Sequence, residues 1–118
     1  MLPRFTKVFL LFLCFLCSTH AQTPSGEISG VIFDASGLVV PGVKVSLNNL
    51  ATNASREVVT NEAGLYTFPA LQPGIYTLRA EKPGFRAVER RNIEVLVGSE
   101  NRIDLSLEVG ELTSTVEV

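Results

Sequence analysis

Apolar and polar residues alternate in short runs along most of this chain, a pattern typical of strands with one buried face. In one clear run, Tyr76, Leu78 and Ala80 fall on one face while Thr77 and Arg79 fall on the other. Successive side chains of a strand point to opposite faces, so this run predicts a half-buried strand. Beyond the first twenty or so residues, no stretch keeps a helical period over eleven residues, and almost no helix is expected.

Comparable runs predict seven short strands, at residues 27–33, 43–48, 55–60, 65–68, 75–80, 93–97 and 103–107. Turns rich in Gly, Pro and Asn separate them. In one of these turns Gly74 follows Pro73, the type II signature, so Gly74 is expected to have a positive φ. Pro69 has no N–H to donate and is expected to end the pairing of its strand. Short strands at this spacing predict an antiparallel β-sandwich.

The charged stretch at residues 86–91 is expected at a sheet edge, where charge discourages aggregation. The same alternation predicts which side chains form the core: Ile28, Ile32, Val43, Val45, Leu47, Tyr66, Phe68, Tyr76, Leu78, Phe85, Ile103 and Leu105.

The first 21 residues have the three parts of a signal peptide. Two basic residues precede the unbroken apolar run 8–17, and small residues follow at Thr19 and Ala21. A membrane anchor needs about 20 apolar residues, and the run 8–17 is only half that length, which favours the signal peptide. A lipid attachment at Cys17 would favour a small residue where Leu16 stands. We therefore expect cleavage after Ala21 and export to the periplasm, the outer membrane or the medium.

Without these residues the chain has no cysteine and no histidine, since Cys14, Cys17 and His20 all lie before the cleavage point. Thiol chemistry and the usual zinc ligand sets are then excluded. The remaining charges are interspersed and carry a net negative sign, and no basic patch suggests nucleic acid.

The carboxylates are scattered singly, mostly at outward strand positions such as Glu57 and Asp104. Oxygens of Asp34, Asn61 and Glu62 are of the type that binds calcium, but their place in turns already explains these residues. We predict no catalytic residue, no cofactor and no metal, and hence no enzyme.

Five motifs follow one another in this sequence. They are Ile-Ser-Gly-Val-Ile-Phe-Asp at 28–34, Pro-Gly-Val-Lys-Val at 41–45, Thr-Asn-Glu-Ala-Gly-Leu-Tyr at 60–66, Leu-Gln-Pro-Gly-Ile-Tyr at 71–76 and Pro-Gly-Phe at 83–85. Together they resemble the carboxypeptidase regulatory-like domain. The resemblance covers about residues 26–109 and implies a seven-stranded, transthyretin-like sandwich with a carbohydrate-binding-like fold and no peptidase activity.

Carbohydrate binding has little support in the residues themselves, because sugar platforms usually need exposed aromatic rings. The chain has no Trp, and Tyr66, Phe68 and Tyr76 suit the core.

The last residues resemble the segment that joins such a domain to the plug of TonB-dependent outer-membrane receptors. Thr115, Val116, Glu117 and Val118 are similar to the start of a TonB box, although an ordinary β-rich tail also explains them. The resemblance implies a TonB-like energy-coupling protein, or the plug and barrel of a receptor, as partner.

The expected organisation is a signal peptide at 1–21, a leader at 22–26, the sandwich at 27–109 and an extended tail at 110–118. Two functions fit it. The first is a non-catalytic accessory module at the N-terminus of a TonB-dependent receptor, present here as a fragment or truncated product. The alternative is a stand-alone module that binds carbohydrate or protein.

Overall fold

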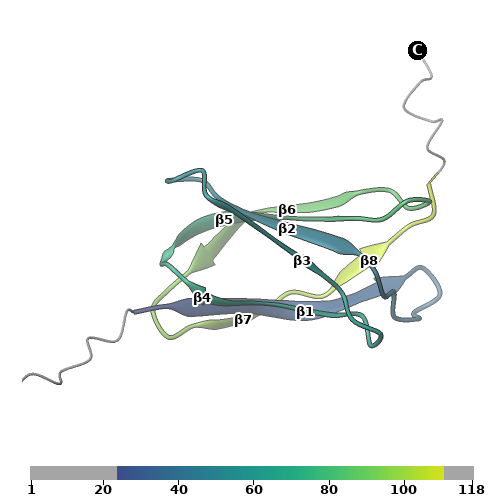
Figure 1. The fold of residues 1–118 in the computed structure, drawn as a ribbon, viewed down its shortest axis with the longest axis horizontal. Coiled ribbons are helices and arrows are strands. Elements are labelled where there is room, and N and C mark those ends of the chain that lie inside the picture. Colours follow the sequence, from purple (N-terminus) through teal and green to yellow (C-terminus); the bar gives the residue numbers. More distant parts are fainter. Residues whose placement is uncertain (1–23, 111–118) are drawn as a thin grey trace, which may run out of the picture.

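A computed structural model describes residues 24–110, which form an all-β sandwich of two sheets (Figure 1). The strands are β1 (Gly26–Asp34), β2 (Lys44–Asn49), β3 (Ser55–Val59), β4 (Leu65–Leu71), β5 (Gly74–Glu81), β6 (Val88–Val95), β7 (Glu100–Arg102) and β8 (Leu105–Leu107). The prediction of a β-sandwich is confirmed.

In the first sheet, β1 lies between β4 on one side and both β7 and β8 on the other. In the second sheet the order is β3-β2-β5-β6, and all neighbours are antiparallel. The two sheets bury their inner faces against each other, as alternating strands require.

Ten of the twelve predicted core side chains are buried, and the other two, Phe85 and Ile103, are partly buried. Ile103 lies at the break between β7 and β8, and Phe85 lies in the loop between β5 and β6. The core also contains side chains outside the predicted set: Val40, Leu71, Ala80, Ile93, Val95 and Leu107.

The end of the chain departs from the expected antiparallel arrangement. The segment predicted as one strand at 103–107 is β8 alone, while β7 precedes it, so the sandwich has eight strands. Both β7 and β8 pair with β1 in parallel. Strands from the two ends of the described chain can pair in this direction because the intervening residues cross to the second sheet and back.

The strand predicted at 93–97 begins earlier and ends sooner. The charged stretch is joined to it in β6, which is an edge strand as predicted, and Val97 lies beyond its end with 62% of its surface exposed.

The prediction that Pro69 ends its strand is wrong. Strand β4 continues to Leu71, with Phe68 opposite Ile28 and Leu71 opposite Gly26, so β4 holds one extra residue in a bulge. A bulge tolerates proline because its extra residue makes no ladder bond. The positive φ expected at Gly74 occurs instead at Ala70, where φ is 54°.

A side chain from the other sheet caps this bulge. The guanidinium of Arg56 on β3 donates to the carbonyl oxygens of Pro69, at 2.6 Å, and Ala70, at 3.1 Å. Arg56 therefore ties the edge of the second sheet to the edge of the first.

The described chain enters the sandwich at one end and leaves it at the other (Figure 1). Its exit is fixed by an antiparallel bridge between Phe85 and Val109. The N–H of Arg86 donates to Glu108 O at 2.8 Å, and the N–H of Gly110 donates to Gly84 O at 3.1 Å.

Candidate functional site

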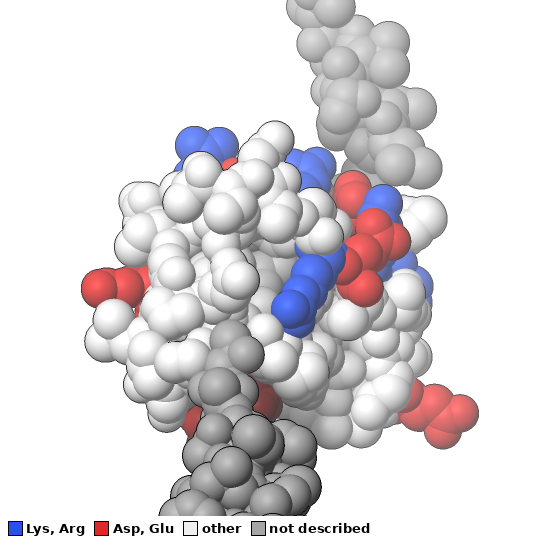
Figure 2. All heavy atoms as spheres, turned by 60° about the vertical axis from the view of Figure 1, so that its left-hand side comes forward, with Lys and Arg blue, Asp and Glu red and all other residues white. Residues whose placement is uncertain are grey.

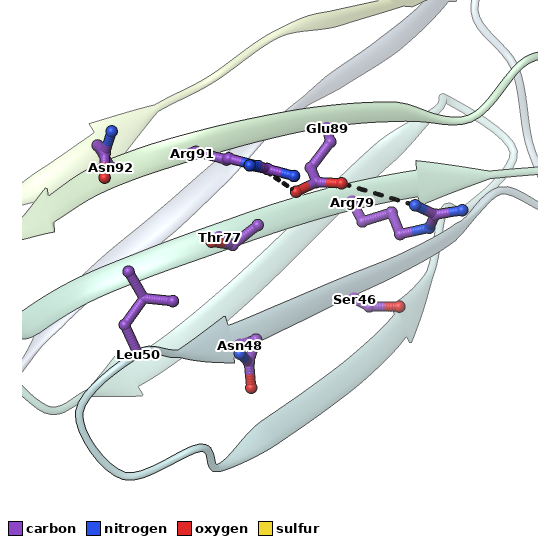
Figure 3. Close-up of a pocket in the computed structure, with 8 residues that line it drawn as sticks. All are labelled: Ser46, Asn48, Leu50, Thr77, Arg79, Glu89, Arg91 and Asn92. Carbon is purple, nitrogen blue, oxygen red and sulfur yellow. Dashed lines mark hydrogen bonds and ion pairs between the residues drawn. The ribbon is translucent and has the colours of Figure 1, made fainter.

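A hollow of about 580 Å³ lies on the outer face of the second sheet (Figure 3). Side chains from β2, β5, β6 and the turn after β2 line it: Ser46, Asn48, Leu50, Thr77, Arg79, Glu89, Arg91 and Asn92. We call this site the outer hollow.

Strand alternation explains why polar residues form the floor of the outer hollow. On β2 the neighbours Val45 and Leu47 are buried, so Ser46 and Asn48 point outward. Ser46 lies opposite Arg79, and Asn48 lies opposite Thr77 on β5. Two cross-strand polar pairs thus lie side by side on one face.

A bulge in β6 shapes the rim of the outer hollow. Ile93 pairs with Tyr76 and Arg90 pairs with Leu78, so β6 carries one residue more than β5 between these pairs. Asn92 takes the left-handed conformation there, with φ 56°, which Asn tolerates better than most residues. Both residues of the bulge line the outer hollow, with Arg91 extending toward Glu89 and Asn92 lying apart from it (Figure 3).

Ion pairs link the charged residues of this face. Arg91 Nε donates to Glu89 Oε1 at 2.6 Å, and Arg79 Nη1 lies 3.6 Å from Glu89 Oε2 (Figure 3). Arg79 also lies 3.8 Å from Glu81, which lies 3.6 Å from Lys44. Exposed pairs of this kind contribute only about 0–1 kcal/mol each. Because cations and anions alternate in these pairs, neither sign of charge dominates this face.

The end where the described chain begins likewise carries blue and red atoms scattered among uncharged ones (Figure 2). Neither surface offers the continuous positive patch that a nucleic-acid backbone requires.

The outer hollow offers hydroxyl, amide and guanidinium groups, which can form hydrogen bonds with a polar ligand. No aromatic side chain lines it, so it has no ring on which a sugar could stack. Tyr66, Phe68 and Tyr76 are buried, as the sequence predicts.

A second hollow of about 450 Å³ lies where the β2–β3 loop meets the corner between β4 and β5. Its polar groups bond to one another. The Tyr76 hydroxyl donates to Gln72 O at 2.6 Å, and Asn49 Nδ2 donates to the Tyr76 oxygen at 3.3 Å. Asn49 Oδ1 accepts from the N–H of Ala51 at 2.9 Å. This arrangement holds the loop in place.

The turn oxygens considered as calcium ligands are used within their own turns. Asp34 Oδ1 accepts from Ser36 Oγ at 2.6 Å and from the N–H of Leu38 at 3.0 Å. The Ser36 hydroxyl first, and then the N–H of Leu38, hold the pKa of the Asp34 carboxyl below its ordinary value. Asn61 Oδ1 accepts from the N–H groups of Ala63 and Leu65.

Glu62 is exposed beside Asn61 in the second of these turns. Within residues 24–110, no three His, Cys, Asp or Glu side chains lie close enough to hold a metal ion. The same residues contain no helix that is long and apolar enough to cross a membrane.

The predicted partner strand, Thr115 to Val118, lies outside the described residues, as does the predicted signal peptide at 1–21. The structure supplies the point from which the tail leaves, at Gly110.

Sequence reasoning missed the outer hollow as a site. Its floor could have been predicted, because alternation places Ser46, Asn48 and Thr77 on the outer face of strands that were predicted correctly. The bulge that adds Arg91 and Asn92 has only a weak signal, since asparagine tolerates a positive φ but does not require one.

The profile of the carboxypeptidase regulatory-like domain family matches residues 27–108. Among curated proteins, the TonB-dependent transporter Oar of Myxococcus xanthus is 32% identical over 105 residues. That alignment covers 87% of this chain and 10% of the transporter, so the chain spans about a tenth of its relative's length.

Solved structures share the fold at low sequence identity. A protein of Bacteroides uniformis put forward as a carbohydrate-binding protein has a TM-score of 0.59 at 21% identity, covering 72% of this chain and 42% of its own. Catechol 1,2-dioxygenase of an Acinetobacter species also has a TM-score of 0.59, at 15% identity, covering 86% of this chain and 58% of its own. At these identities the likeness extends to the fold alone.

Proposed function

Since this chain belongs to the carboxypeptidase regulatory-like domain family, we propose that it is an exported, non-catalytic accessory module at the N-terminus of a TonB-dependent outer-membrane transporter. The observation that carries the proposal is the 32% identity with such a transporter across 87% of this chain. The signal-peptide pattern of residues 1–21 supports export.

The geometry of the sandwich suits a module within a longer chain. Entry and exit lie at opposite ends (Figure 1), so the domain would hold apart the segments joined to its two ends. The backbone bonds of Glu108 and Gly110 to the 84–86 segment set the direction in which the chain leaves the sandwich.

The family's domain is regulatory, and the groups that sequence analysis singled out for chemistry have structural partners here. Asp34 and Asn61 hold their turns, and Asp104 accepts the N–H of Val31 at 2.9 Å. Asp34 does accept from the Ser36 hydroxyl, but its other partners are the N–H groups of Ser36 and Leu38, so this pair lacks the third, orienting group of an activated nucleophile. We therefore propose no reaction for this module.

The test is to detect the protein in the cells that make it. An antibody against residues 24–110 is applied to separated outer-membrane, periplasmic and secreted fractions. A band in the outer membrane, far larger than the 12.8 kDa of this chain, is the expected result. A band near 12.8 kDa or slightly smaller in a soluble fraction would contradict the transporter proposal and favour the stand-alone module.

We also propose that residues 115–118 bind a TonB-like energy-coupling protein by adding a strand to one of its sheets. Strand addition depends on main-chain N–H and C=O groups. Val116→Pro removes one such N–H and should abolish binding, while Ser114→Ala keeps the backbone donors and should change it little. Titration of the purified full chain with the periplasmic domain of the coupling protein measures both. Equal binding by the two variants would contradict strand pairing.

The outer hollow is the observation that favours the alternative, a module that binds carbohydrate or protein. Its test is a glycan and peptide array probed with the full chain and with Asn48→Ala, which removes an amide from the floor. Glu62→Ala, in an exposed turn, is the control. Signal lost with Asn48→Ala alone would support ligand binding in the hollow, and signal unaffected by both would contradict it.

A further inference from the structure

The strand where the chain enters the sandwich is paired with the strands from which it leaves. Glu27, Ile28 and Ser29 of β1 lie beside Glu100, Asn101 and Arg102 of β7, and Ile32, Phe33 and Asp34 lie beside Leu105, Ser106 and Leu107 of β8, all in parallel. We propose that this pairing makes the domain a force-bearing link, which resists tension applied between its two ends. We call the pairing of β1 with β7 and β8 the seam.

The direction of the strands determines how tension acts on the seam. Tension draws the start of β1 toward the entry end and the finish of β8 toward the opposite end (Figure 1). The two strands are therefore made to slide along each other. Their inter-strand hydrogen bonds lie across the direction of pull, and many of them must break together.

The antiparallel pair β5–β6 would respond differently. Gly74 and Val95 form the pair at its open end, and the loop 82–87 joins the other end. Pulling the open ends apart breaks the rungs one at a time, so a smaller force is enough. The second sheet therefore provides an internal comparison for the seam.

The seam is continuous across the break between β7 and β8. The N–H of Ile103 donates to Ser29 O at 2.8 Å. Two residues along β1, the N–H of Val31 donates to Asp104 Oδ1 at 2.9 Å. A carboxylate acceptor makes this bond stronger than a neutral one. Asp104 thus replaces the backbone carbonyl that a regular strand would supply.

Close approach at this break requires a glycine. A Cβ on Gly30 would overlap the backbone carbonyl of Ile103. From the neighbouring strand β4, the Tyr66 hydroxyl donates to the same Ile103 carbonyl. Segments from β1, β4 and the break therefore meet at one point.

The inner side of the seam is closed to water. Ile28 and Ile32 on β1, and Leu105 and Leu107 on β8, have 2% or less of their surface exposed. Hydrogen bonds shielded from water are stronger electrostatically, and water reaches them less readily when they are stretched. At the entry end the N–H of Glu27 donates to Ser99 O at 2.9 Å, which extends the seam by one further bond.

Single-molecule force spectroscopy on the full chain tests the proposal, and it depends on the geometry rather than on the proposed receptor. In one arrangement, marker domains fused to the two chain ends apply tension across the seam. In the other, handles on unnatural side chains placed at Pro73 and Val97, both exposed, pull open the β5–β6 pair. We expect a severalfold larger unfolding force in the first arrangement. An equal or smaller force there would overturn the proposal.

Variants locate the resistance within the seam. Asp104→Ala should lower the end-to-end unfolding force and leave the force through residues 73 and 97 unchanged, while Asp104→Asn, which keeps an oxygen acceptor, should restore part of it. Arg91→Ala removes an exposed ionic partner from the second sheet and serves as control. A drop for Arg91→Ala as large as for Asp104→Ala would mean that general stability, not the seam, sets the force. The wild-type comparison of the two arrangements holds even where a variant fails to fold.

Discussion

In the second sheet every pair of neighbours is antiparallel and, apart from the bulge in β6, the buried faces follow from simple alternation. In the first sheet, by contrast, β1 joins three strands that come from two distant parts of the chain. The second sheet places Val45 and Leu47 inward and Ser46 and Asn48 outward. The first sheet needs a glycine at 30, a bulge in β4 and a carboxylate that replaces a backbone acceptor.

The difference indicates how each sheet is specified. The second is specified by a pattern that many sequences could satisfy, so single outward substitutions should matter little. The first is specified by a few atoms that let strands distant in sequence approach closely. Substitutions matched between the two sheets can test this contrast.

The largest effects are expected where the two sheets share a core, and there the contrast should vanish. Phe68 on β4 and Leu78 on β5 have 1% and 0% of their surface exposed. Phe68→Ala and Leu78→Ala should each lower the free energy of unfolding by about 2–5 kcal/mol. Denaturant melts measure both.

Leu65→Ala is the control, because this residue is 45% exposed on β4. A surface change of this kind should alter stability by no more than about 0.5 kcal/mol. If Phe68→Ala and Leu78→Ala each lowered the free energy of unfolding by less than about 1 kcal/mol, the buried faces of these strands would be wrongly assigned.

The contrast should appear clearly between two glycines. At Gly30 an added Cβ meets backbone that has no rotamer to change, so Gly30→Ala should cost about 1–3 kcal/mol or more. At Gly74 the nearest atoms to an added Cβ lie 3.6 Å away or farther, which is ordinary contact, and φ is not positive. Gly74→Ala should therefore be neutral or slightly stabilising. Equal losses in thermal or denaturant melts would contradict the contrast.

Much of the fold could be predicted because alternation is a local property. Val43, Val45 and Leu47 are buried since each lies two residues from the next in a strand. The edge position of β6 also followed from its charges. Partners that lie far apart in the sequence, such as Val31 and Asp104 with a separation of 73 residues, leave no such local trace.

The bulge in β4 illustrates why the remainder escaped sequence reasoning. Pro73 and Gly74 satisfy a type II turn by themselves, yet the positive φ occurs at Ala70. Tertiary contacts determine which residue takes the positive φ, because Arg56 donates to the carbonyls of Pro69 and Ala70 from the opposite sheet. The outer hollow was not predicted from the sequence for a similar reason, since its rim depends on a bulge at Asn92.

A smaller effect is expected at Tyr66, whose hydroxyl donates to the Ile103 carbonyl within the seam. Tyr66→Phe should lower the free energy of unfolding by about 0.5–1.5 kcal/mol. Burial, and secondly the Asp104 carboxylate, raise the pKa of Tyr66 above its ordinary value of 10. In the unfolded chain the phenol ionises near pH 10, while in the fold it stays neutral.

The stability that neutral Tyr66 contributes is therefore complete below about pH 10 and is lost as the pH rises above it. Urea melts at pH 8 and near pH 11 measure this loss. The wild type should lose more stability over that interval than Tyr66→Phe, in which the titrating group is gone. Identical losses in the two proteins would show that the hydroxyl does not titrate differently on folding.

A small gain in stability is expected at the two non-glycine residues in left-handed bulges, Ala70 in the first sheet and Asn92 in the second. The left-handed conformation costs alanine about 1–2 kcal/mol. Glycine avoids that strain but loses more chain entropy on folding, by about 0.5–1 kcal/mol. Ala70→Gly should therefore raise the free energy of unfolding by a few tenths to about 1 kcal/mol.

Two matched changes sharpen this last prediction. Ala63→Gly, in an exposed turn without a positive φ, has no strain to relieve and should lower stability by about 0.5–1 kcal/mol. Asn92→Gly should gain less than Ala70→Gly, because asparagine already tolerates the left-handed conformation. A loss for Ala70→Gly equal to that for Ala63→Gly would mean that the β4 bulge is unstrained. Arg56 would then hold a conformation that the chain adopts readily, and the first sheet would depend less on single atoms than its geometry indicates.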